Sequence, residues 1–182
     1  MPKEIKDKIQ TKTDSDITSN RAIKKEVNSY QLAFTELPKE VKEAKTSVLF
    51  YFMPSLGDQV KDISIADSES YLAQSIETLK KSLPDTLIVL VTPHPVSSEL
   101  QHYNSRTLDY RDYMKSGIKV AEEMKIPLFD LHTAFEKALE EGNEELESQL
   151  KKDGILLNTE GEQLTSRLVE EFLEEPIDTT GG

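Results

Sequence analysis

Polar side chains that could carry chemistry follow the apolar runs of this chain and occur in one segment near its end. The candidates are Gly57, Asp58, His94, His132, Asp153 and Asn158. If the apolar runs form parallel strands, these residues lie near the carboxyl edge of one sheet, where open α/β sheets bind ligands. The spacing therefore predicts one site at that edge, assembled from distant parts of the chain.

His94 and Asp153 are the candidate catalytic residues, and Gly57, Asp58 and Asn158 are candidate binding residues. The imidazole of His94 lies between two prolines, where it could act as a base near neutral pH or be a loop residue without a chemical role. Asp153 precedes a glycine, which is equally typical of a tight turn. Asp58 and Asp153 could also pair around a divalent cation, although carboxylates are common at strand ends.

Other polar and aromatic residues have two readings each. Ser97, beside Ser98, could be a nucleophile near His94, but residues this close in sequence on a proline-bounded loop rarely reach one another correctly. His132 follows an apolar run and is expected to open a helix. Tyr110 and Tyr113 could stack on a sugar ring, while packing within a helix is the simpler reading.

The elements that must position these residues follow from hydrophobic periodicity. Three continuous apolar runs predict buried parallel strands at residues 47–53, 86–91 and 127–131. Apolar residues at helical spacing predict helices around residues 72–83, 114–124, 133–139, 144–150 and 164–172. Alternating strands and helices with short connections predict a three-layer α/β/α sandwich with a mostly parallel sheet.

The length of 182 residues fits one domain spanning residues 1–182. We expect flexible ends at residues 1–15 and 176–182. Leu32, Leu37 and Val41 suggest a helix before the first apolar run, and residues 16–23 could form a weak edge strand.

Composition excludes several classes of partner. The net charge of −12 argues against nucleic acid and anionic lipid, whereas a protein partner stays open. No stretch approaches the roughly 18 apolar residues of a membrane span. No glycine-rich phosphate loop follows a strand, and the chain has three histidines and no cysteine, so we expect no cofactor and no metal. The composition is compatible with a secreted or wall-associated bacterial protein whose targeting segment is absent, but it does not fix the compartment.

The order of these segments, and their pattern of apolar strands, polar turns and helices, resemble the SGNH (GDSL-type) hydrolases over roughly residues 20–175. The resemblance rests on "SLPDTLIVLVTPHPV", "KIPLFDLHTAF" and "DGILLNTEGEQL", the last being similar to the family's closing Asp-Gly-x-His-x-Asn-x-x-Gly block. It implies an α/β/α fold and acyl or O-acetyl ester hydrolysis, with a carbohydrate as one form of ligand. In the family, a serine attacks the ester, the closing aspartate and histidine activate it, and fixed donors bind the oxyanion.

This sequence departs from the family pattern at most functional positions. Asp153 matches the closing aspartate, but Leu156 stands where the histidine is expected. Ser55 and Gly57 stand where the family has glycine and asparagine. Lysines follow Asn20 where a glycine is expected, and no buried strand leads into a Gly-Asp-Ser block, since residues 6–12 before Ser15 are too polar.

Three functions remain open from the sequence. The first is an SGNH-like domain of esterase ancestry that is catalytically degenerate or N-terminally incomplete and acts as a binding or scaffold module. The second is an active esterase that uses displaced residues such as His94, or a serine upstream of this chain. The third is an acidic, flavodoxin-like protein-interaction domain without an ester pocket.

Overall fold

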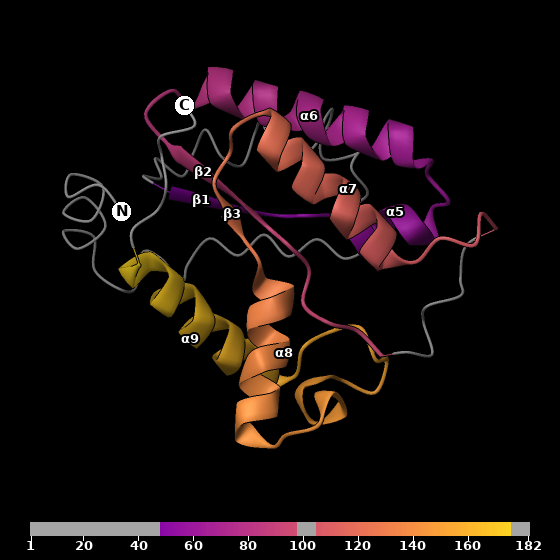
Figure 1. Cartoon of the computed structure of the whole chain (residues 1–182), viewed down its shortest axis with the longest axis vertical. Coiled ribbons are helices and arrows are strands. Elements are labelled where there is room, and N and C mark those ends of the chain that lie inside the picture. Colours follow the sequence, from indigo (N-terminus) through magenta and orange to yellow (C-terminus); the bar gives the residue numbers. More distant parts are fainter. Residues whose placement is uncertain (1–47, 98–104, 176–182) are drawn as a thin grey trace.

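The structure is a computed structural model that describes residues 48–97 and 105–175. Its strands and helices alternate along the chain (Figure 1). In order they are β1 (Val48–Phe52), α5 (Ser55–Val60), α6 (Ile65–Ser82), β2 (Leu87–Val91), α7 (Tyr110–Glu123), β3 (Leu128–Phe129), α8 (Leu131–Gly142), the 3₁₀ helix η3 (Leu146–Gln149) and α9 (Thr159–Glu174).

The three strands form a parallel sheet in the order β1-β2-β3. The register pairs Val48 with Leu87 and Phe52 with Val91, and it pairs Val91 with Phe129. Because the strands are parallel, the segments that follow them all leave from the same edge of the sheet.

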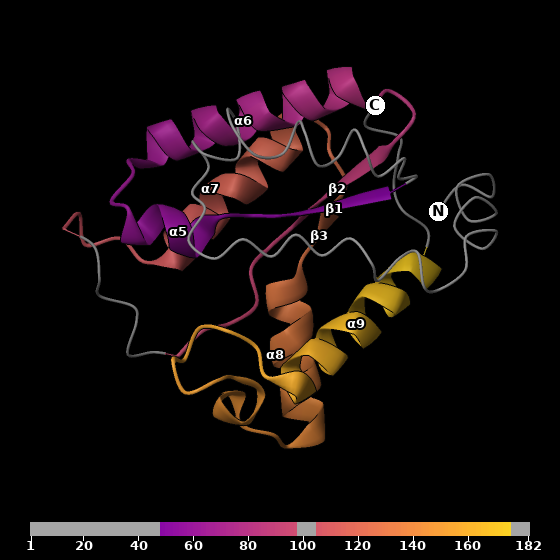
Figure 2. The ribbon, with the colours of Figure 1, turned by 180° about the vertical axis from the view of Figure 1, so that it is seen from behind.

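Helices cover both faces of this sheet. Figure 1 shows α6 and α7 on one side and α8 with α9 on the other, and Figure 2 shows the same two layers from behind. The predicted three-layer α/β/α sandwich is confirmed.

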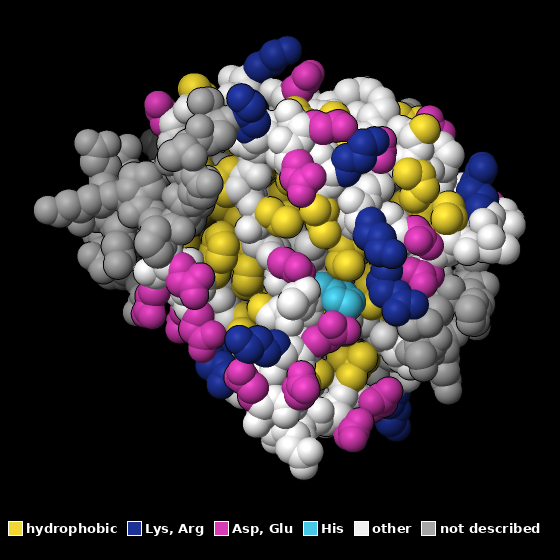
Figure 3. All heavy atoms as spheres, viewed as in Figure 1, with side chains coloured by type: hydrophobic (Ala, Val, Ile, Leu, Met, Phe, Trp, Pro, Cys, Tyr) yellow, Lys and Arg dark blue, Asp and Glu magenta, His cyan; other side chains and the backbone are white. Residues whose placement is uncertain are grey.

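The central strand explains why its sequence is continuously apolar. Ile88 and Leu90 pack into the core beneath α6 and α7, while Val89 and Val91 pack into the core beneath α8 and α9. A strand buried on both faces has no reason to alternate apolar with polar residues. Hydrophobic side chains show at the surface between the two helix layers, with charged side chains around them (Figure 3).

Two predicted elements differ from the structure. The run at residues 127–131 gives a strand of two residues, because Asp130 accepts from the Thr133 backbone N–H and so caps α8 instead of extending the sheet. The helix predicted at residues 144–150 is a single 3₁₀ helix. Asn143, in the left-handed conformation with φ 52°, ends α8 just before it.

The predictions for residues 1–15, 16–23, 32–41 and 176–182 lie outside the described residues. Within the described residues, none of the helices is both long and apolar enough to cross a bilayer.

Candidate functional site

The candidate site consists of two segments that meet at the carboxyl edge of the sheet. The first is the 92–97 loop, which follows β2. The second is residues 153–156, called here the closing turn, which precede α9. Two hydrogen bonds join them: the His94 imidazole Nε2 lies 2.7 Å from the Ile155 carbonyl oxygen, and the Ser97 backbone N–H donates to the Gly154 carbonyl oxygen at 2.9 Å.

His94 is oriented by this contact. A carbonyl oxygen only accepts, so Nε2 carries the proton and donates it to Ile155. Burial lowers the pKa of His94 and His132 acts in the same direction, whereas the hydrogen bond to Ile155 opposes the shift. The ring lies 6.4 Å from the ring of Phe135, centroid to centroid. The neutral imidazole therefore has its Nε2 proton engaged by the backbone.

Asp153 shapes the closing turn. One of its carboxylate oxygens, Oδ1, accepts from the backbone N–H groups of Ile155 and Leu156, both at 2.9 Å. Gly154 has φ 67°, a left-handed conformation that suits glycine. The carbonyl oxygen of Leu156 accepts from the Lys151 N–H at 2.7 Å. The turn reading of Asp153 is thus supported by its bonds, and Leu156 brings no titratable group to the turn.

His132 belongs to a second hydrogen-bonded group, which sequence reasoning did not find. Its Nε2 lies 2.9 Å from the Tyr110 hydroxyl, and its Nδ1 lies 3.6 Å from a carboxylate oxygen of Glu136. The His132 Nε2 and the Tyr110 hydroxyl share one hydrogen bond, whose donor depends on which ring nitrogen carries the proton. Burial raises the pKa of Tyr110, and the backbone N–H of Val96 opposes that shift.

Thr92 ties β2 to the start of α8. Its hydroxyl accepts from the His132 backbone N–H at 2.9 Å and donates to the Asp130 carboxylate at 3.2 Å. Tyr110 and Tyr113 are each 2% exposed, so they pack within the protein, as the simpler reading of these tyrosines predicted. The pairing of Tyr110 with His132 links residues on two helices and has no local signal in the sequence.

Gly57 and Asp58 lie in α5, directly after β1. Asp58 is 1% exposed, and its Oδ2 accepts from the Ser68 hydroxyl at 2.5 Å. Burial raises the pKa of Tyr51, and the charge of Asp58 adds to this shift. The Gly57 carbonyl accepts from the Lys61 N–H at 3.0 Å. Asp58 thus joins α5 to α6 inside the protein, while Gly57 is half-buried.

Asn158 caps α9. Its side-chain oxygen accepts from the Gly161 N–H at 3.0 Å, and its amide group donates to the carbonyls of Ser148 and Leu150 at 2.7 and 3.2 Å. These bonds fix the start of α9 against the segment that leads into the closing turn. Its role as a binding residue stays a prediction.

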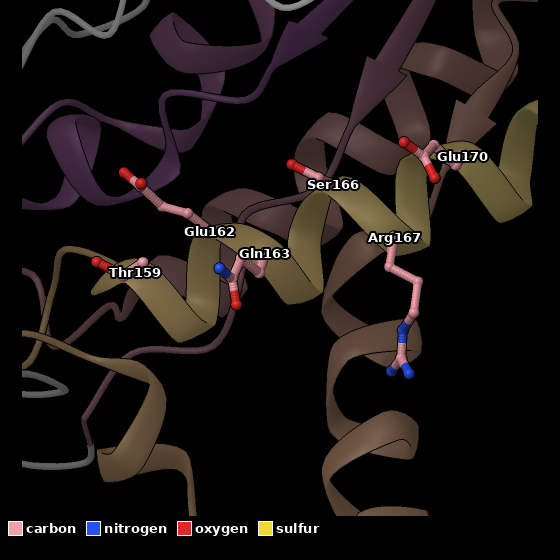
Figure 4. A pocket seen from close by; sticks show the side chains of 6 residues that line it. All are labelled: Thr159, Glu162, Gln163, Ser166, Arg167 and Glu170. Carbon is pink, nitrogen blue, oxygen red and sulfur yellow. The ribbon is translucent and has the colours of Figure 1, made fainter.

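A surface hollow of about 380 Å³ lies along one face of α9, apart from the candidate site. Figure 4 shows its lining side chains, all from that helix: Thr159, Glu162, Gln163, Ser166, Arg167 and Glu170. The candidate residues Gly57, Asp58, His94, Asp153 and Asn158 do not line it.

The arrangement brings together only part of what was predicted. His94 and the turn of Asp153 are in contact through Ile155. Among the residues that the structure describes, neither His94 nor His132 has a hydrogen bond to a serine hydroxyl, and three or more ligands suited to a metal do not come together. Ser15 lies outside the described part of the chain.

No protein-family model matches the chain, and no curated protein matches it. Its fold, however, is that of the SGNH/GDSL-type hydrolases, as comparison with solved structures shows.

One similar structure is a GDSL-like lipase from Parabacteroides merdae, at 18% identity and a TM-score of 0.65, covering 82% of this chain and 69% of that one. A second is an acetyl-xylooligosaccharide esterase from a Geobacillus species, at 15% identity and a TM-score of 0.61, covering 83% and 69%. A third is a peptidoglycan O-acetylesterase, at 16% identity and a TM-score of 0.58, covering 75% of this chain but only 39% of that chain.

Proposed function

We propose that this chain is an SGNH-type domain of ester-hydrolase ancestry that no longer hydrolyses esters and serves as a binding or scaffold module. The observation that carries the proposal is the closing turn. Leu156 stands where the family resemblance expects the general base, and the Nε2–H group of the nearby His94 donates a hydrogen bond to the Ile155 carbonyl. Serine is a weak nucleophile unless a positioned base accepts its proton.

Lost catalysis also fits the state of the remaining candidate residues. Asp153 directs a carboxylate oxygen to backbone N–H groups of its own turn. Asp58 is buried against Ser68. In both cases the side chain stabilises the scaffold, which is the role expected when a fold is retained without its chemistry.

For the ligand we propose an acyl or O-acetyl ester, in particular an acetylated carbohydrate. Two structurally similar proteins are by name an acetyl-xylooligosaccharide esterase and a peptidoglycan O-acetylesterase. The expected binding surface is the carboxyl edge of the sheet, around Gly57, His94 and Asn158.

Ester hydrolysis by the full chain tests the loss of catalysis. We expect p-nitrophenyl acetate to be hydrolysed no faster than in buffer with an equal concentration of free imidazole, and His94→Ala to leave that rate unchanged. The matched control is His132→Ala, which removes a second buried imidazole near the same edge of the sheet. Turnover that disappears in His94→Ala but persists in His132→Ala would show an active esterase with a relocated base and overturn the proposal.

Binding is tested separately by nuclear magnetic resonance with acetylated and deacetylated xylo-oligosaccharides. We expect the acetylated ligand to shift the amide signals of the 92–97 loop and the closing turn, and the deacetylated ligand to shift them less. Signals that move equally with both ligands, or only along α9, would contradict the proposed ester-binding edge.

A further inference from the structure

The outer side of β1 presents backbone groups that a further strand could bind. The Met53 N–H donates to the Val91 carbonyl at 2.9 Å, so the backbone of residue 53 faces β2. Because successive residues of a strand face opposite sides, the N–H and C=O groups of Val48, Phe50 and Phe52 point away from β2. In the strand order of the described residues, β1 stands at one end, with no strand on this side.

The side chains of β1 are typical of a strand that is paired on both sides. Leu49 and Tyr51 pack toward α6 and α7, whereas Val48 and Phe50 pack toward α8 and α9. Edge strands are usually short or carry charges, and β3 at the other end has only two residues. β1 has five, and residues 46–57 contain no charged side chain. This edge is therefore suited to a partner strand.

We propose that residues 16–23 of this chain are that partner and run parallel to β1 along its outer side. Residues 16–23 lie outside the described part of the chain. They include Ile17, Thr18 and Ile23, whose branched side chains favour strands, while residues 3–12 are mostly charged. The proposal concerns the sheet, and it does not depend on whether the domain binds or hydrolyses esters.

The 24 residues between this segment and β1 suit a parallel connection. Parallel strands need a dozen or more residues between them, usually including a helix. Apolar side chains recur here at helical spacing, at Val27, Tyr30, Phe34 and Leu37. Residues 38–47 contain no glycine or asparagine, the residues that favour the tight turn of an antiparallel hairpin. A crossover helix thus fits the sequence better than a hairpin.

The hand of such a crossover places its helix on the face that α6 covers. α6 joins β1 to β2 over the side of the sheet to which Leu49 and Tyr51 point, as Figure 2 shows. A connection of the same hand, leading from outside β1 into β1, crosses the same face. Its apolar stripe would then cover Leu49, which is only half-buried.

The chain's own segment is favoured over a second copy for two reasons. A covalent tether of this length gives an effective concentration of about 1 mM. Residues 1–47 contain 10 Lys and Arg against 8 Asp and Glu, whereas the rest of the chain contains 12 against 26. The segment is thus attracted to the remainder of its own chain, while whole copies with a net charge of −12 repel one another.

Amide hydrogen exchange of Phe50 in the full chain tests the pairing. We expect its N–H to exchange at least about 100-fold more slowly than an unstructured amide, as hydrogen bonds inside a sheet do, and equally slowly at low and high protein concentration. Exchange at the unstructured rate would overturn the proposal. Protection that grows with protein concentration would show that a second copy fills the edge, which would also overturn it.

Thr18→Pro and Ser19→Pro form a matched pair of variants. Adjacent residues of a strand direct their N–H groups to opposite sides, and proline has none to donate. One of the two should lower the protection of Phe50 by about tenfold, and the other should leave it nearly unchanged. Gln10→Pro is the control outside the segment and should have no effect. Equal effects of Thr18→Pro and Ser19→Pro would contradict the pairing.

A spin label gives a test that leaves residues 16–23 unaltered. The chain has no cysteine, so Phe52→Cys offers a single attachment site, at a position that is 45% exposed. The nitroxide should broaden the amide signals of residues 16–23, whereas a nitroxide on Lys137→Cys, exposed on α8, should leave them sharp. Sharp signals with both labels would overturn the proposal. So would broadening that passes from labelled chains to unlabelled chains in a mixture, because it would identify a second copy as the partner.

Discussion

Gly161 lies where α9 passes close to the chain that leads into the closing turn. A Cβ atom at this position would lie 2.3 Å from the Gln149 carbonyl oxygen and 2.9 Å from a methyl carbon of Leu157. The first neighbour is backbone, which cannot move aside as a flexible side chain can. The glycine of the closing Asn-x-x-Gly pattern thus has a packing role.

Gly161→Ala should lower the free energy of unfolding by about 1–3 kcal/mol, the usual cost of forcing extra volume into a packed region. Gly142→Ala is the matched control, because its Cβ would lie 3.1 Å from the end of the Glu144 side chain, which can rotate away. Urea unfolding of the two variants provides the measurement. Equal losses, or no loss in Gly161→Ala, would contradict the packing argument.

α6 and α9 both begin at a capping side chain, and the two caps differ in the number of groups they bind. The Ser64 hydroxyl caps α6 by accepting from the Asp67 N–H at 3.1 Å, and it donates to the carboxylate of the same residue at 2.8 Å. Asn158 caps α9 and also donates to two carbonyls of the preceding segment. Asn158 therefore joins a helix start to a loop, whereas Ser64 serves mainly its own helix.

Asn158→Ala should cost about 2 kcal/mol of unfolding free energy, and Ser64→Ala about 1 kcal/mol, since a lost cap costs about 1 kcal/mol and further hydrogen bonds add to that. Thermal unfolding monitored by circular dichroism gives both values under the same conditions. If Ser64→Ala proved the more damaging substitution, the bonds from Asn158 to Ser148 and Leu150 would contribute little to stability.

Elements with strong local signals could be predicted from sequence, and those decided by single contacts could not. The strands at Val48–Phe52 and Leu87–Val91 were evident because burial on both sides demands continuous apolar residues. The third strand was predicted too long, because a sequence does not show that the Asp130 side chain caps α8. The loop of His94 could be placed at the sheet edge, but its contact with Ile155 joins residues 61 positions apart. The pairing of Tyr110 with His132 likewise depends on how α7 and α8 approach.

Across the whole molecule, acidic charge is concentrated toward the end of the chain. Residues 131–175 contain 13 Asp and Glu residues but only 4 Lys and Arg residues, and Figure 3 shows many acidic side chains on the half of the surface that includes α8. Ion pairs such as Lys137 with Glu141 are exposed and 3.9 Å apart, so they offset little of the repulsion. The folded state of this region therefore accumulates like charge.

Sodium chloride should raise the melting temperature, because salt screens repulsion over about 10 Å at 0.1 M. We expect a gain of about 2–4 °C between 0.02 and 0.5 M, equivalent to about 1 kcal/mol, measured by scanning calorimetry. Glu170→Gln should produce part of this gain at low salt. The matched control Glu69→Gln, which removes the partner of Lys119, should not. A melting temperature that falls with added salt would show that attractive pairs dominate.

The shortness of β3 affects whether a strand from another molecule can pair with this edge of the sheet. In the strand order of the described residues, β3 stands at one end and contributes only Leu128 and Phe129. The residue before them is Pro127, whose nitrogen has no hydrogen to offer, and Asp130 after them already turns into a helix. Within the described residues, a second polypeptide running alongside β3 would find too few free backbone groups to extend the sheet, so this edge of the sheet resists pairing with a further strand.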